Sequence, residues 1–318
     1  MVVLLPAAAG LAQTDTPGPA AAKITVYTQW PFDAAQATTR QQDAAGALGV
    51  PVTRQIELAD GVSLSLVLIP AGQFVMGAPE DESRLDPDES PPSRVTIRRP
   101  FWIGALEITN KQYRLFRPEH NSRSIDTHWK DRVGPGPSLD AENQPVIRIS
   151  CLEARSFCAW LSHKTGQRFR LPTEPEWEYA CRAGTDTPVH CPVDELAKYA
   201  NFADASLKSI KPWALRDGGS NDGSSVSAQV GKYLPNAWGV YDMHGNVAEW
   251  CDSTYAPYPF TGTVQGHDRA GDGLRVVRGG SWDDRPRRCR SAFRLSYPAD
   301  YRVYNVGFRV VCGALAAK

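Results

Sequence analysis

The sequence lacks an excess of charge of either sign, and it lacks a long hydrophobic run. Its 318 residues include 35 Lys and Arg and 35 Asp and Glu, so the formal net charge is zero. A chain without a basic excess has no electrostatic footprint for nucleic acid or for an anionic membrane surface. No segment reaches the roughly 20 consecutive apolar residues that cross a bilayer. We therefore expect no nucleic-acid partner and no membrane span.

Common catalytic signatures are also missing. The six histidines are scattered along the chain without metal-ligand spacing. No glycine-rich loop of the phosphate-cradling type is present. The segment 279–282, Gly-Gly-Ser-Trp, is typical of a turn and not of a hydrolase nucleophile elbow. These absences argue against a histidine metal enzyme, a nucleotide-binding loop and a serine hydrolase.

What the chain does contain predicts one substantial globular domain that is rich in loops. Hydrophobic residues make up 42% of the sequence, and there are 26 Gly, 25 Pro and 9 Trp. This composition favours many fixed turns and large aromatic anchors around a sizeable core. We divide the chain into a signal-like apolar segment with a linker (1–25), a helical N-terminal extension (26–54), a main domain (55–313) and a tail (314–318).

The first 13 residues form an apolar run that ends in small residues. Such a run resembles the hydrophobic core and cleavage end of a secretory signal, although the usual positive charge at the start is missing. A disordered apolar tail is the alternative. We favour export, which predicts a periplasmic or secreted protein.

Three helices and one hairpin can be placed from local patterns. The segment 32–49 predicts a helix that Asp33 caps and Gly49 ends, and its alanine-rich stripe predicts that it docks on the main domain. Apolar residues at helical spacing predict a helix over 151–165, and a Thr cap and a glycine bound another over 173–184. Two strand-like runs around Ala-Asp-Gly predict a hairpin over 54–69.

The most informative stretch is 240–252, where Asp242 and Glu249 flank a tight Gly-Asn turn. Hard oxygen ligands set this closely suit calcium, particularly if the carbonyls of the turn point inward. Solvated loop carboxylates are the alternative explanation.

Five motifs stand in a characteristic order: Gly-Gln-Phe-Val-Met-Gly (72–77), Glu-Ile-Thr-Asn-Lys-Gln-Tyr (107–113), Arg-Leu-Pro-Thr-Glu-Pro-Glu-Trp-Glu-Tyr-Ala (170–180), Arg-Gly-Gly-Ser-Trp (278–282) and Val-Gly-Phe-Arg-Val (306–310). Over roughly 55–313 the chain resembles a formylglycine-generating-enzyme-type, or sulfatase-modifying-factor, domain. The resemblance implies an α+β fold similar to C-type lectins, with little regular secondary structure. It implies activity only weakly, because members include oxidases, iron-dependent sulfur-transfer enzymes, pigment-maturation proteins and binding proteins.

The resemblance also implies two structural calcium sites. The first corresponds to Asn201, the carbonyl of Phe202, Asp222 and the carbonyl of Ser224; the second corresponds to Asp242, the carbonyls of Gly245 and Val247, and Glu249. Asp242 stands where the family often has Asn, and its added charge should strengthen the binding of a divalent cation.

Seven cysteines suit an oxidising compartment. Family disulfides join two helices to C-terminal strands, which here implies Cys158–Cys312 and Cys181–Cys289, with both strand partners displaced by two residues. An offset of two keeps a side chain on the same face of a strand. The pairing of Cys151, Cys191 and Cys251 stays open.

Catalysis is where the sequence departs from the family. The oxidases use two cysteines, five residues apart, shortly after Gly-Gly-Ser, to hold copper(I) and exchange with a substrate thiol. Here Asp284 stands in the first position, and the match to downstream motifs assigns Cys289 to a structural pair, so we expect no copper. Ala248 replaces a tryptophan usually found beside the oxygen pocket. The three-histidine partner domain of the iron-dependent members is missing from the sequence.

A polar and aromatic segment remains as the candidate cleft. Its candidates for chemistry are Ser281, Asp283 and Asp284, and its candidates for ligand binding are Trp282, Arg285, Arg287, Arg288, Phe293, Tyr297, Tyr301 and Tyr304. Tyr, Trp, Arg and Asp make specific contact surfaces. The pattern is similar to the variable segments of lectin-fold proteins that retroelements diversify; an ordinary loop surface is the alternative.

Three functions are compatible with these residues. We favour an exported protein that binds a peptide, glycan or small molecule in its cleft, without copper and cysteine chemistry, and with carboxylate-assisted chemistry at Asp283 and Asp284 left open. The second is a formylglycine-generating oxidoreductase that acts on sulfatases or another protein. The third is a retroelement-diversified receptor.

Overall fold

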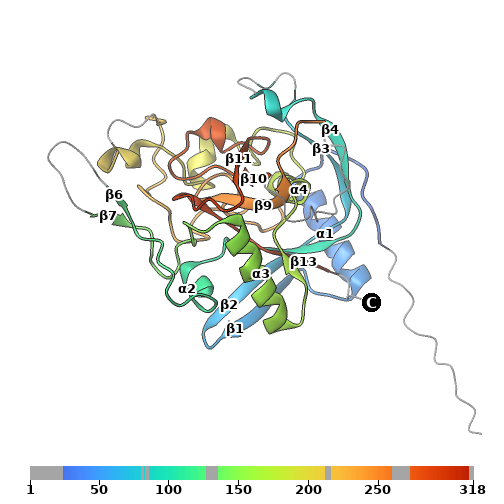
Figure 1. Cartoon of the computed structure of the whole chain (residues 1–318). Coiled ribbons are helices and arrows are strands. Elements are labelled where there is room, and N and C mark those ends of the chain that lie inside the picture. The colour runs from blue at the N-terminus through green and yellow to red at the C-terminus, as the bar shows by residue number, and fades with distance from the viewer. Residues whose placement is uncertain are drawn as a thin grey trace, which may run out of the picture.

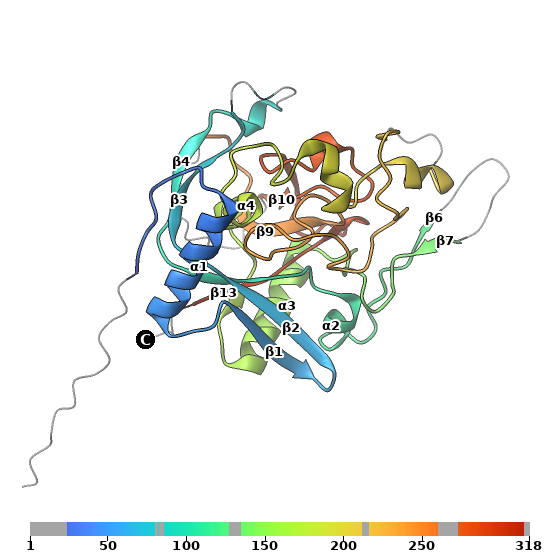
Figure 2. The same cartoon turned by 180° about the vertical axis from the view of Figure 1, so that it is seen from behind.

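The computed structural model describes residues 24–79, 82, 86–126, 135–211, 216–259 and 273–314. Two main sheets, two short strand pairs and several helices make up this part of the chain (Figure 1, Figure 2). Almost all of the signal-like segment at 1–25 and most of the tail at 314–318 lie outside the described residues. The proposed domain boundaries stay predictions. Within the described ranges, no helix has the length and apolar character needed to cross a membrane.

The first sheet joins residues from both ends of the described chain. Its strands lie in the order β1 (Thr53–Ala59), β2 (Val62–Ile69), β5 (Phe101–Gly104), β13 (Val311–Gly313) and β8 (Phe169–Arg170). β1 and β2 form the predicted antiparallel hairpin, and the turn between them passes through Gly61, whose φ of 67° suits glycine. β13 pairs antiparallel with both β5 and β8, so a sheet that starts near residue 53 is completed near residue 313.

The second sheet supports the candidate site. Its order is β11 (Arg294–Pro298), β10 (Leu274–Arg278), β9 (Ala248–Thr254) and β12 (Val306–Gly307). β10 runs antiparallel to both of its neighbours, whereas the short β12 runs parallel to β9. Two further pairs are β3 (Gly72–Met76) with β4 (Ser93–Ile97), and β6 (Ser124–Asp126) with β7 (Pro135–Ser138).

Local capping chemistry explains where the helices begin. α1 (Ala34–Leu48), α2 (Asn110–Arg114), α3 (Cys151–Thr165) and α4 (Glu174–Arg182) each start with a reciprocal capping box. The predicted cap at Asp33 and the left-handed stop at Gly49 are confirmed for α1. For α4 the cap at Thr173 is confirmed, but the left-handed residue at the C-terminal end is Ala183, one residue before the expected glycine.

Short 3-10 turns complete the regular structure. They are η1 (Pro87–Glu89), η2 (Val193–Lys198), η3 (Ala205–Ser209) and η4 (Pro286–Arg288). The last two belong to the loops that form the candidate site.

The N-terminal helix docks on the main body, as its alanine stripe predicts. α1 and α3 are seen on opposite sides of β13 in the two views (Figure 1, Figure 2). The side-chain amide of Gln41 donates to the carbonyls of Leu68 and Trp238 at 2.9 and 3.1 Å. The amide of Phe32 donates to the carbonyl of Gly184 at 2.9 Å. A Cβ at residue 184 would lie 2.4 Å from the carbonyl oxygen of Phe32, so this close approach requires glycine.

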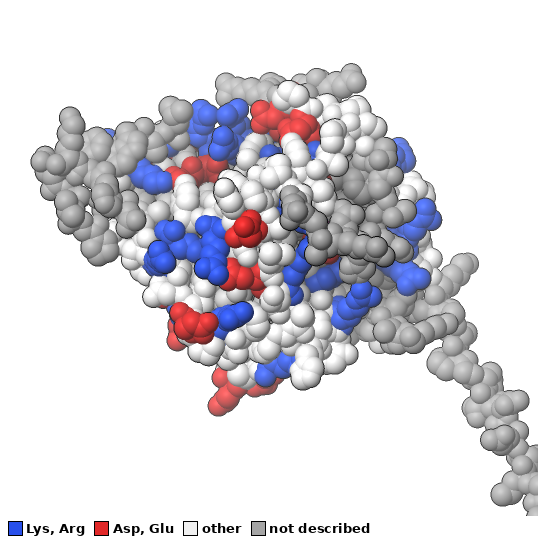
Figure 3. Space-filling view, in the orientation of Figure 1, with Lys and Arg blue, Asp and Glu red and all other residues white. Residues whose placement is uncertain are grey.

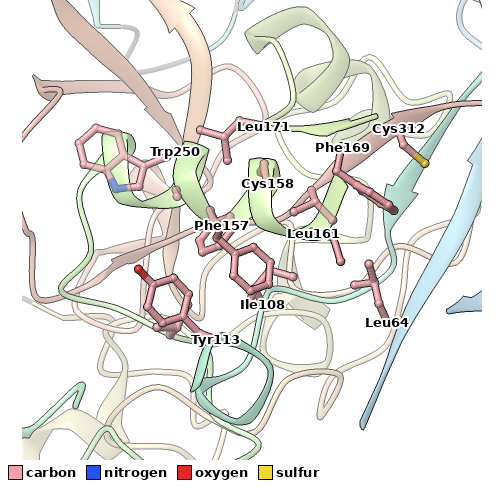
Figure 4. Close-up of a cluster of buried hydrophobic side chains, with 14 of the residues drawn as sticks. Leu64, Ile108, Tyr113, Phe157, Cys158, Leu161, Phe169, Leu171, Trp250 and Cys312 are labelled. Carbon is pink, nitrogen blue, oxygen red and sulfur yellow. The ribbon is translucent and has the colours of Figure 1, made fainter. Parts of the chain in front are cut away.

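The largest apolar core lies between α3 and the first sheet. Phe157 and Leu161 of α3 pack there with Leu64 of β2 and with Tyr113 and Trp250 (Figure 4). The rings of Tyr113 and Phe157 are stacked with centroids 5.5 Å apart. Burial of such large rings away from water is the dominant favourable term for this part of the fold.

A buried ion-pair cluster holds α4 against its surroundings. Oε1 of Glu178 accepts hydrogen bonds from Arg182 Nε and from the amide of Gly77, both at 2.9 Å, and its other oxygen pairs with Arg278. Glu174 pairs with Arg294 at 2.6 Å, and Arg170 pairs with Glu176 at 2.6 Å. Because Glu178, Arg182 and Arg278 are all inaccessible to water, each charge depends on its partners for compensation.

We expect Glu178→Gln to destabilise the protein by about 3–5 kcal/mol, because the neutral amide keeps the shape but leaves two buried guanidinium groups under-compensated. Urea unfolding followed by circular dichroism measures the change. The control is Arg302→Gln, which breaks the exposed pair with Glu153 and should cost at most about 1 kcal/mol. Equal losses in the two variants would contradict the assigned role of Glu178.

Candidate functional site

A two-glycine turn after β10 positions the candidate site. Gly279 and Gly280 adopt φ angles of 96° and 70°, which are left-handed conformations. A Cβ on Gly280 would lie 2.6 Å from the carbonyl oxygen of Arg288 and 2.8 Å from the sulfur of Cys289. The turn therefore packs tightly against η4, and residues 281–289 form a loop that closes on its own start.

Arg278 clamps the two ends of this loop together. It is the last residue of β10, directly before the glycine turn. Its buried guanidinium donates to the carbonyl of Ser291 at 2.8 Å, to that of Ala292 at 2.7 Å, and to that of Phe293. The same guanidinium pairs with Glu178 of α4, so the loop is tied to the ion-pair cluster described above.

Asp284, a candidate for chemistry, is held in place by Ser281 and Arg288. Oδ2 of Asp284 accepts a hydrogen bond from the Ser281 hydroxyl at 2.7 Å, and Oδ1 pairs with Arg288 Nη1 at 3.2 Å. Asn305 Nδ2 donates to the same Ser281 hydroxyl at 2.8 Å. Ser281 and Asp284 are both buried. This carboxylate therefore holds the loop together and is not free to act on a ligand without breaking these bonds.

Asp283 has different surroundings. It accepts a hydrogen bond from the hydroxyl of Tyr304 and forms an ion pair with Lys211. The Lys211 ammonium lies 5.1 Å from the centre of the Trp282 ring and 5.3 Å from that of Tyr304. Burial and the carboxylate of Asp283 raise the pKa of Tyr304, which keeps its hydroxyl protonated and donating.

The remaining predicted ligand-binding residues differ in exposure and in the elements that carry them. Phe293 is buried, and the Arg288 guanidinium lies 5.9 Å from the centre of its ring. Tyr297 is half-buried on β11, with its ring centre 6.2 Å from that of Trp250. Tyr301 is 56% exposed. The remaining two predicted residues, Arg285 and Arg287, are half-buried at the start of η4 and within it.

Charge is mixed on the face seen in Figure 3. Lys and Arg side chains alternate there with Asp and Glu side chains, and no broad area of one sign covers its described residues. The mixture agrees with the zero formal net charge of the chain.

The residues predicted for the first calcium site lie together. Oδ2 of Asp222 accepts from the amide of Phe202 at 2.9 Å, and Oδ1 accepts from the amide of Ser224 at 2.8 Å. The neighbouring Asn201 is buried, and its Oδ1 has no hydrogen-bond partner. Burial, with the nearby Asp204 carboxylate, raises the pKa of Asp222 to about 7. A buried oxygen without a partner in this cluster fits a hard cation, and the ammonium of Lys232 also lies there, donating to Ser224 Oγ at 2.6 Å.

The second predicted site is different, because a guanidinium already contacts one of its carboxylates. Glu249 pairs with Arg309 through contacts of 2.6 and 2.7 Å and also accepts from the Trp177 indole at 2.9 Å. Oδ2 of Asp242 accepts from the amide of Gly231 at 2.7 Å, whereas its buried Oδ1 has no partner. Burial raises the pKa of Asp242 to about 6.

A third carboxylate, Glu107, adjoins this second site. It accepts from Asn246 Nδ2 at 2.6 Å and from the amide of Val247 at 3.1 Å. Burial and the charges of Asp242 and Glu249 raise the pKa of Glu107 well above its usual range. Glu107 and Asp242 thus lie near the guanidinium of Arg309, which hydrogen-bonds to Glu249, and burial together with the neighbouring carboxylates disfavours their charged forms. Across the described ranges, no three His, Cys, Asp or Glu side chains are arranged as a metal-binding group.

Neither predicted disulfide is formed, because all seven cysteines are unpaired. Cys289 lies at the end of η4 and not on a strand, so the two-residue offset argument does not apply to it. Its sulfur lies 4.0 Å from the carbonyl oxygen of Asp284, whereas that of Cys181 lies 3.7 Å from both Met243 O and Ser291 Oγ. The Cys312 sulfur points away from Cys158 (Figure 4). The predictions of Cys158–Cys312 and Cys181–Cys289 are therefore corrected.

Sequence reasoning missed Lys211, Asn305, Glu107 and Arg309 as parts of these sites. Glu107 and Arg309 lie within motifs that carry the family resemblance, which was the available signal. No local signal marked Lys211, because it reaches Asp283 across 72 residues of chain.

Comparison with known proteins decides the family. Residues 59–314 match the sulfatase-modifying factor enzyme 1-like domain. The chain belongs to this family. The bovine (Bos taurus) protein named inactive C-alpha-formylglycine-generating enzyme 2 is 28% identical, over 82% of this chain and 92% of that protein.

Solved structures agree with the family assignment. PvdO from Pseudomonas aeruginosa has a TM-score of 0.67 at 30% identity, covering 82% of this chain and 98% of PvdO. Variable protein 1 from Treponema denticola has a TM-score of 0.64 at 25% identity, covering 83% of this chain and 100% of that protein. The predicted α+β fold of the formylglycine-generating-enzyme type is confirmed.

We expect all seven cysteines to react with an alkylating agent in denaturant without added reductant, because none is paired. In the native protein, the half-buried Cys191 should react first. Its reaction should be slow, because burial raises the pKa of its thiol to about 11. Intact-mass spectrometry counts the added groups, with a reduced sample as the control. Fewer than seven adducts in the unreduced denatured protein would contradict the unpaired state.

Proposed function

We propose that this chain is a ligand-binding member of the sulfatase-modifying factor family that does not carry out copper-dependent cysteine oxidation. The observation that carries the proposal is the position of Asp284 and the bonds that its carboxylate makes. This residue stands in the first copper-cysteine position of the oxidases, and it is bonded to Ser281 and Arg288. A carboxylate is a hard ligand that suits copper(I) poorly, and it cannot exchange disulfides. The similarity to a relative named as inactive supports this reading.

The ligand-binding surface in this proposal is the loop 281–288 with Tyr304. Trp282 and Asp283 belong to this loop, as do half-buried arginines. The two-glycine turn and Arg278 hold the loop through their contacts with its backbone. A rigid support with polar and aromatic side chains is the usual basis of specific recognition. The ligand class we propose is a peptide, glycan or small molecule. Asp283 is the better candidate for any carboxylate-assisted chemistry, because the carboxylate of Asp284 is already bonded to Ser281 and Arg288.

Two alternatives rest on particular observations. The oxidoreductase alternative is favoured by the buried Cys289, which lies five residues after Asp284 and next to it in space. The receptor alternative is favoured by the similarity to a Treponema protein named as variable.

Export and calcium binding are further parts of the proposal. Export to the periplasm or outside the cell rests on the apolar run at residues 1–13, which lies outside the described residues; seven unpaired thiols add no support to it. Calcium would be held at the first site by Asn201, Phe202, Asp222 and Ser224, and at the second by Asp242, Gly245, Val247 and Glu249. The two buried oxygens without partners, Asn201 Oδ1 and Asp242 Oδ1, support these assignments. Calcium would supply structural support for loops and no reaction step.

The purified protein should bind copper(I) weakly and convert no cysteine-containing sulfatase peptide to the aldehyde, even with oxygen and reductant supplied. The reason is that Asp284 offers no thiolate. Mass spectrometry of the peptide and competition with a copper(I) chelator measure the two outcomes. Asp284→Cys restores two cysteines five residues apart and should bind copper(I) more tightly than the natural protein. Enzyme-like conversion by the natural protein would restore the oxidase reading.

Calcium should raise the melting temperature, and a chelator should lower it. At a hundredfold excess over the dissociation constant, one site would add about 2.7 kcal/mol of stability. Asp222→Asn and Asp242→Asn test the two sites separately, because each removes one negative charge and keeps the shape. Glu249→Ala is unsuitable, since it also leaves Arg309 buried without its partner.

The control for both sites is Asp194→Asn, an exposed acid, which should keep the full response to calcium. A melting curve that is the same in calcium and in excess chelator would rule out both sites.

A further inference from the structure

The ammonium group of Lys211 lies in a niche that one carboxylate and two aromatic rings enclose. It pairs with Asp283, and it lies 5.1 and 5.3 Å from the ring centres of Trp282 and Tyr304. The two rings are T-shaped, with centroids 6.3 Å apart. A carboxylate with two ring faces is the combination that proteins use to recognise organic cations. We call Trp282, Asp283 and Tyr304 the ammonium niche.

The walls of the niche are held by contacts that do not involve Lys211. Trp282 is 1% exposed and packs in an apolar cluster with Ile147 and Val247. Its amide donates to the carbonyl of Asn246 at 2.9 Å. The hydroxyl of Tyr304 donates to Asp283, which orients that carboxylate. These contacts should keep the niche in shape when Lys211 leaves.

The side chain of Lys211, in contrast, can move out of the niche. Lys211 lies just beyond η3, on a segment far in sequence from the niche, and its side chain is 21% exposed. A lysine side chain is flexible, and a ligand cation that took its place would keep the largely buried Asp283 carboxylate compensated. A cation supplied by a ligand could therefore compete for the same place.

We propose that the ammonium niche recognises an organic ammonium group of the ligand, and that Lys211 fills the niche in the free protein. The inference rests on the proposed function, in that it places ligand binding on the loop 281–288, and it adds the ligand's chemical class. It also assigns to Lys211 the role of an internal competitor, so that removal of its ammonium group should strengthen binding. If the ion pair were purely structural, the removal of Lys211 would weaken binding, since it would only loosen the loop.

Tetramethylammonium is the probe, and isothermal titration calorimetry at constant ionic strength is the measurement. Lys211→Ala should bind the probe about tenfold more tightly than the natural protein, because the cation no longer competes with a tethered one. Adding Asp283→Asn to Lys211→Ala should weaken binding again by about tenfold, through the loss of the charge. tert-Butyl alcohol, a neutral molecule of similar shape, should bind much more weakly than the probe to Lys211→Ala.

Lys208→Ala is the matched control, because Lys208 is exposed on η3, just before Lys211, and has no part in the niche. It should behave as the natural protein does. Circular dichroism and a cooperative melting curve establish that each variant is folded. The inference is overturned if folded Lys211→Ala gives no saturable heat with the probe, if it binds the neutral molecule equally well, or if it binds no more tightly than the natural protein. Because copper binding and peptide conversion are measured separately, failure here is distinguishable from failure of the proposed function.

Discussion

The pairing of glutamates on α4 with arginines of both main sheets is the constraint on which the rest of the structure depends. Glu174, Glu176 and Glu178 lie two residues apart on a short helix, so their side chains leave it in different directions. They reach Arg294 of β11, Arg170 of β8 and Arg278 of β10. One turn of helix thus ties both main sheets together. In a fold with short strands, fully compensated charges fix the relative position of loops that apolar packing alone would leave loosely defined.

The same pairing reaches the candidate site through Arg278. This residue ends β10, pairs with Glu178 and holds the carbonyls on the far side of the 281–289 loop. The interior of the protein therefore fixes the position of the loop. Side chains that point outward from the loop can change without disturbing this support. Within the family this separation gives a physical reason why one fold supports oxidases as well as proteins without that chemistry.

The sequence was sufficient for features that depend on neighbours along the chain. The caps at Asp33 and Thr173 and the hairpin turn at Gly61 follow from local hydrogen bonding and backbone conformation, and the structure agrees with each. It was insufficient where distant segments meet. The pair of Glu249 with Arg309 joins residues 60 positions apart, and no periodicity links them. The prediction of the two disulfides was wrong for the same reason, because a position on one face of a strand does not bring two sulfur atoms within bonding distance.

The placement of β13 has a consequence for the order in which a newly made chain can fold. A ribosome releases the hairpin of β1 and β2 first, yet β13 lies between β5 and β8 in the completed sheet. The contacts that close this sheet include the pair Phe101–Gly313, which joins residues about 210 positions apart, and long separations of this kind slow folding. Until residue 313 has left the exit tunnel, the edges of β5 and β8 stay open to other chains. A partner that protects the nascent protein would have to cover those edges until β13 emerges.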